Sequence, residues 1–105
     1  MRAVLIVSKY HIPLINQMID RNNVQIVAIL TDDRPVAIEH GFYREFVFGF
    51  WQLKTVLERF YPDYVLFLTP FRMPIDTLTR QMREMNFPLD RVCDLTNYAT
   101  EDSLN

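Results

Sequence analysis

The chain has 105 residues, half of them hydrophobic and 13% aromatic, a composition typical of one folded domain and not of a disordered segment. Its 11 basic and 13 acidic residues give a net charge of -2 without a basic run, so binding to a nucleic-acid backbone is not favoured. The single cysteine, Cys93, excludes an internal disulfide, and no apolar run approaches the roughly 20 residues of a membrane span. With no signal peptide ahead of the first apolar run, we expect a cytoplasmic protein.

The first 33 residues predict a strand, a helix and a second strand. Residues 3–7 are an unbroken apolar run of strand length, and residues 24–30 are a second such run interrupted only by Gln25. Between them Ile12, Ile15 and Ile19 recur at helical spacing, and we expect that helix to end near Arg21-Asn22-Asn23. Strands that are apolar on both faces need cover on both faces, which is typical of a parallel sheet with crossover helices. We therefore expect the first βαβ unit of a Rossmann-like domain.

The middle of the chain predicts a loop, a strand and a helix. Residues 32–35 have loop composition, and residues 36–43 fit either a short helical turn or more of the same loop. Residues 45–48 predict a short third strand. Residues 50–60 predict a helix that Pro62 stops, and its buried face is formed by Leu53, Val56, Leu57 and Phe60.

The remaining residues predict two more strands around a third helix. The strands are expected at residues 64–68 and 91–95, and the helix from Pro74 to Asn86 after a loop at 69–74. Residues 96–105 are polar and aperiodic, so we assign residues 1–98 to the Rossmann-like domain and 99–105 to a tail or a linker to a following domain. The fold class expected is α/β, a three-layer doubly wound parallel sheet of about five strands in the order 3-2-1-4-5. Almost complete burial is predicted for Val4, Ile6, Ile26, Ala28, Val65 and Phe67.

Ligands of such sheets bind beyond the carboxyl ends of the strands, at the switch point between the first and fourth strands. Lys9, His11 and Arg72 should meet there and could hold an anion, while Asp32 and Asp33 stand where nucleotide-binding domains place a ribose-gripping acid. The alternative is that these residues bind no ligand and are ordinary solvated residues at strand ends. The candidate ligand-binding residues are Ser8, Lys9, His11, Asp32, Asp33 and Arg72.

A dinucleotide site needs glycines after the first strand, where this chain has residues with bulky side chains, and Pro13 removes a helix N–H. We therefore expect no NAD or other cofactor, although a nucleotide-sugar or NAD remains an alternative. No catalytic residue and no metal-binding set is predicted, and Cys93 is expected to be buried and inert in the fifth strand.

Six aromatic residues gather in the middle of the chain. They fit either the core or an apolar surface for a second domain or a homo-oligomer, through the region from Phe46 to Trp51. The cluster is Phe42, Tyr43, Phe46, Phe48, Phe50 and Trp51.

Two segments carry a resemblance to a known module: Pro62-Asp63-Tyr64-Val65 with the apolar run after it, and Asn86-Phe87-Pro88 leading to Arg91-Val92. With the order of elements, they make residues 1–98 resemble the Rossmann-like N-terminal domains of sugar-modifying enzymes. These include nucleotide-sugar epimerases and dehydratases, sugar acetyltransferases of the left-handed-helix type, and FkbM-type methyltransferases.

The resemblance implies a non-catalytic accessory domain of, or partner to, a sugar- or polysaccharide-modifying enzyme such as a methyltransferase. The alternative it implies is a nucleotide or nucleotide-sugar binding module that uses the crevice at the ends of the first and fourth strands. Relatives that bind a nucleotide carry glycines where this chain has Ser8 to His11, so the methyltransferase-associated versions fit better.

Overall fold

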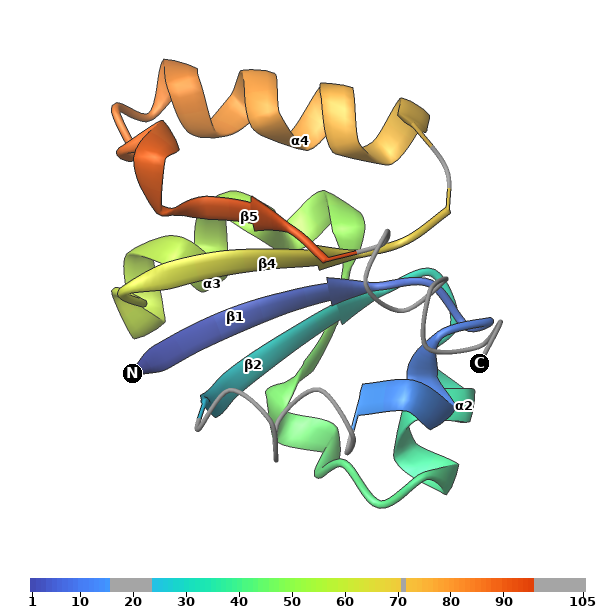
Figure 1. Ribbon diagram of the computed structural model, residues 1–105. Coiled ribbons are helices and arrows are strands. Elements are labelled where there is room, and N and C mark those ends of the chain that lie inside the picture. Colours follow the sequence, from blue (N-terminus) through green and yellow to red (C-terminus); the bar gives the residue numbers. More distant parts are fainter. Residues whose placement is uncertain (16–23, 71, 96–105) are drawn as a thin grey trace.

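The computed structural model describes residues 1–15, 24–70 and 72–95, and these form one five-stranded sheet (Figure 1). All the strand pairs are parallel, in the order β3-β2-β1-β4-β5. This confirms the predicted α/β Rossmann-like fold and its strand order. The strands are β1 (Arg2–Val7), β2 (Gln25–Thr31), β3 (Val47–Gly49), β4 (Tyr64–Leu68) and β5 (Val92–Asp94).

Helices cover both faces of the sheet (Figure 1). On one face lie the 3-10 turn η1 (Ile12–Leu14) and helix α2 (Arg34–Glu39), and on the other lie α3 (Leu53–Phe60) and α4 (Arg72–Glu84). Three further 3-10 turns are η2 (Arg44–Phe46), η3 (Phe50–Gln52) and η4 (Leu89–Arg91). The open question over residues 36–43 is answered by α2, which Asp33 caps by accepting a 3.3 Å hydrogen bond from the Val36 amide.

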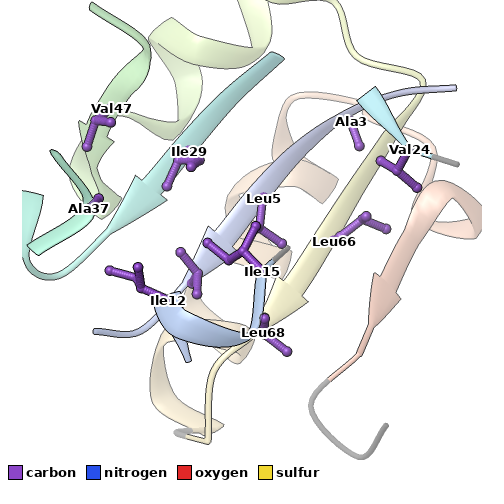
Figure 2. Close-up of a cluster of buried hydrophobic side chains, with 11 residues drawn as sticks. Ala3, Leu5, Ile12, Ile15, Val24, Ile29, Ala37, Val47, Leu66 and Leu68 are labelled. Carbon is purple, nitrogen blue, oxygen red and sulfur yellow. The ribbon is translucent and has the colours of Figure 1, made fainter. Parts of the chain in front are cut away.

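Because side chains alternate along each strand, the sheet separates two buried clusters. The first cluster contains Leu5, with Ile12 and Ile15 packed over the carboxyl-terminal part of the sheet near Leu68 (Figure 2). The second cluster contains Ile6, which lies in register between Leu30 of β2 and Phe67 of β4. Among the six residues predicted as almost fully buried, five are at most 1% exposed: Val4, Ile6, Ala28, Val65 and Phe67.

The sixth, Ile26, is only partly buried, so that prediction was wrong. A bulge lies at this point: Ala3 pairs with Ile26 but Val4 pairs with Ala28, which leaves Val27 as an extra residue in β2. Val27 and Ala28 consequently both face the second cluster, and Ile26 faces the first. At this level β3 no longer accompanies β2, since their pairing begins at Ile29.

The helix ends differ a little from the prediction. Helix α4 begins at Arg72, earlier than the predicted Pro74, and Pro74 is tolerated in the first turn because the N–H groups there have no helical partner. The helix closes with a Schellman motif in which the Phe87 amide donates to the Met82 carbonyl and the Asn86 amide to Arg83. Asn86 has φ +62°, the left-handed conformation that this motif requires. The predicted end of the first helix near Arg21-Asn22-Asn23 and the predicted tail at 99–105 lie outside the described residues.

Candidate functional site

The predicted crevice begins where β1 ends, at Ser8. Ser8 is 1% exposed, and its amide donates to the Leu68 carbonyl of β4. Its Oγ lies 3.0 Å from Nδ1 of His11, and the His11 amide donates back to the Ser8 carbonyl at 3.0 Å. The sequence predicted both residues at this strand end but not their contact, which fixes the turn between β1 and η1.

Partial burial of the His11 ring lowers its pKa from the usual 6.5, because taking the charged form out of water is unfavourable. A neutral ring has one donor and one acceptor nitrogen, so it is suited to the shared hydrogen bond with the Ser8 hydroxyl. At neutral pH His11 therefore offers hydrogen bonding in the crevice but little positive charge for an anion.

The two aspartates at the end of β2 both hold the local backbone. Oδ1 of Asp32 accepts a 2.9 Å hydrogen bond from the Lys9 amide and lies 3.4 Å from Thr31 Oγ1. Asp33 caps α2, and its own amide donates to Thr31 Oγ1 at 3.2 Å. Nucleotide-binding domains use the backbone amides of this turn to bind pyrophosphate. In this chain the Lys9 amide donates to the Asp32 carboxylate instead.

The two remaining cations of the predicted site contact different neighbours. The Lys9 Nζ sits 5.3 Å from the centroid of the Tyr10 ring. Arg72 is exposed at the start of α4 and forms an i,i+4 pair with Asp76 at 3.7 Å. No hydrogen bond or ion pair between described residues joins Arg72 to Lys9 or His11, so the convergence predicted for these three is not seen in the contacts.

A second concave region, which the sequence did not single out, lies on the outer edge of β2. We call it the edge groove, and its volume is about 510 Å³. Its floor is formed by residues 25–29 of β2, and its walls by residues 41–43, Phe46, Phe60 and Arg2. The groove lies at the amino-terminal half of β2, so it is separate from the crevice at the carboxyl ends of the strands.

The aromatic cluster divides between core and surface. Phe42 packs on the first buried cluster, and Phe48 and Phe50 pack on the second. Tyr43 and Trp51 are 73% and 82% exposed, and Phe46 is also exposed while its ring contacts Phe60 edge-on. The core interpretation therefore holds for Phe42, Phe48 and Phe50, and the interface interpretation of the exposed residues stays a prediction.

No set of three or more histidine, cysteine or acidic residues in the described segments is placed to hold a metal ion. Cys93 in β5 is a free thiol, partly buried against the first cluster and less enclosed than predicted. Within those same segments, no helix has the length and apolar character to cross a bilayer.

Comparison of the chain with protein-family models, with curated proteins and with solved structures gives no match. The resemblance to the N-terminal domains of sugar-modifying enzymes therefore stays a prediction, and the function is argued from the residues and their geometry.

Proposed function

We propose that the chain is a non-catalytic Rossmann-like accessory domain that belongs to, or works beside, a sugar- or polysaccharide-modifying enzyme such as a methyltransferase. The observation that carries the proposal is a contrast between two regions. The polar groups of the crevice are largely engaged in holding their own turns, whereas the edge groove presents an open apolar surface with aromatic walls.

The crevice supports this proposal through the way its polar groups are used. The Lys9 amide is engaged by Oδ1 of Asp32, and Asp33 caps the start of α2. A ligand phosphate or ribose would have to displace or share these hydrogen bonds, at the cost of the local structure that they support.

The exposed aromatic residues support a docking role. Tyr43, Phe46 and Trp51 lie within one short segment around β3, and aromatic side chains are enriched at protein interfaces. We propose this region as the contact with a second domain or a second copy of the chain. A cytoplasmic location accords with the free thiol of Cys93.

Genetics in the host organism tests the proposal. The gene segment for residues 1–95 is deleted, and the methyl and acetyl content of the surface polysaccharides and nucleotide-sugars is measured. The proposal predicts a change in sugar modification that returns when the wild-type segment is restored. An unchanged sugar composition would contradict it.

A second candidate function is binding of a nucleotide-sugar or another anion in the crevice. The observation that favours it is the placement of the Ser8–His11 pair beside the exposed Lys9 at the end of β1. Titration with phosphate and with a uridine diphosphate sugar, read by amide chemical shifts, tests it. Shifts at Lys9 and His11 that disappear in Lys9→Ala would favour this candidate over the accessory domain.

A further inference from the structure

The inference concerns the edge groove, and it starts from an uncovered stretch of sheet edge. β1 accompanies β2 along its whole length, from Gln25 to Thr31. On the other side β3 pairs only with Ile29, Leu30 and Thr31. Within the described residues, the outer edge of residues 25–28 therefore has no neighbouring strand.

The backbone of this stretch has hydrogen-bonding groups that point outward. The Gln25 amide donates to the Met1 carbonyl on the β1 side. Consecutive amides of an extended strand point to opposite edges up to the bulge at Val27, so the Ile26 amide points toward the groove. An uncovered strand edge of this kind is a template for pairing with another extended chain.

The walls of the groove fit an added strand because they come from both faces of the sheet. Phe42 packs against the first buried cluster and Phe60 against the second. Side chains of a strand alternate between the two faces, so one set would meet Phe42 and the other would meet Phe60. The free edge at residues 25–28 spans about 13 Å at roughly 3.3 Å per residue, the length of a peptide strand of about four residues.

The charge of the groove selects among extended peptides. Arg2 carries the only charge among the described lining residues. Its guanidinium donates to the uncharged carbonyls of Phe60 and Tyr61, at 2.7 and 3.1 Å, while Asp63 accepts from the Arg2 backbone amide. Since β1 and β2 are in register at Arg2 and Gln25, this positive charge lies at the amino-terminal end of the groove.

We propose that the edge groove binds an extended peptide segment of a partner protein by adding it as a strand beside residues 25–28 of β2. The segment carries apolar side chains at alternate positions and an acidic residue at the end next to Arg2. This inference rests on the proposed accessory function and names the chemistry of its partner. Strand addition supplies affinity through main-chain hydrogen bonds and specificity through the pockets for alternate side chains.

Selection from a library of random ten-residue peptides displayed on phage, panned on the full chain, tests the proposal. We expect enriched peptides with alternating apolar residues and an acidic residue near one end. When added to the labelled chain, such a peptide should shift and protect the amides of residues 25–28. Methylation of alternate amide nitrogens along one edge of the peptide should abolish its binding, because it removes the main-chain donors.

Variants of exposed wall residues provide the matched comparison. The double variant Tyr43→Ala and Phe46→Ala should weaken the selected peptide by about tenfold or more, as expected for loss of aromatic contacts. Tyr10→Ala removes another exposed aromatic residue that does not line the groove, so it should leave affinity within about twofold. Circular dichroism checks that every variant remains folded.

Four results would overturn the proposal: no enriched peptide, peptides that bind as helices, amide shifts confined to the crevice, or equal affinity in the double variant. A dimer of the chain that dissociates in the double variant would also overturn it, because a second copy would then occupy the groove. These results are independent of the sugar analysis after gene deletion, so failure of the groove and failure of the accessory function can be distinguished.

Discussion

Two isoleucines in neighbouring strands give a direct test of how burial falls from the centre of the sheet to its free edge. Ile6 is fully buried in β1, between Leu30 and Phe67, and strands on both sides are held by backbone pairing. The surroundings of Ile6 can collapse little, so we expect Ile6→Ala to lower the free energy of unfolding by about 3–5 kcal/mol, the upper part of the usual range. Ile26 is partly exposed beside the edge groove, where water can fill the space, so Ile26→Ala should cost about 1–2 kcal/mol.

Urea unfolding followed by far-ultraviolet circular dichroism measures both values. Fluorescence is a poor reporter here because Trp51 is 82% exposed in the folded chain and its surroundings change little on unfolding. Equal losses for the two variants would refute the reasoning, since a partly exposed Ile26 should lose less than a fully buried Ile6. A clearly larger loss for Ile26→Ala would contradict it in the same way.

The remaining predictions concern pH, a helix end and cofactors. Because burial lowers the pKa of folded His11 below its unfolded value near 6.5, its contribution to stability is present above that pH and is lost as the pH falls below it. His11→Gln should therefore flatten the dependence of unfolding free energy on pH between about 7.5 and 5.5, and an unchanged slope would exclude His11 as its source. Asn86→Ala should destabilise the chain by about 1 kcal/mol in urea unfolding, and Asn86→Gly should not, because φ is +62° there. NAD and NADP at millimolar concentration should leave the melting temperature unchanged, whereas binding at 100 times the dissociation constant would add about 2.7 kcal/mol.

The sequence predicts the sheet well because its central strands are hydrophobic on both faces. The runs at residues 3–7 and 64–68 are apolar throughout, and the structure pairs them at the centre of the sheet. The bulge could not be predicted, because Ile26, Val27 and Ala28 are all apolar and no alternation shows which face each one takes. The sequence could not decide between a helical turn and a loop at α2 for a related reason. Its few apolar residues, Val36 to Ile38, are too short a run to establish a period.

The candidate site was likewise predictable in part. The order of strands predicts that Ser8, Lys9 and Asp32 lie at one end of the sheet, and the contacts confirm it. That Asp32 accepts from the Lys9 amide depends on the exact path of two turns, which residue types alone do not specify. The aromatic residues that line the edge groove stand out in the sequence. The groove itself could not be predicted, because that requires knowing that β3 pairs only from Ile29 onward.

Site-specific photo-crosslinking in the host cell tests the central claim most directly, that this domain acts by docking through the edge groove. Tyr43, at the groove, and Tyr10, beside the crevice, are both exposed and are replaced one at a time by p-benzoylphenylalanine. The account predicts a crosslink from position 43 to a sugar- or polysaccharide-modifying enzyme, or to such a domain of the same parent chain, and none from position 10. A crosslink from position 10 alone, or no such partner at position 43, would contradict it.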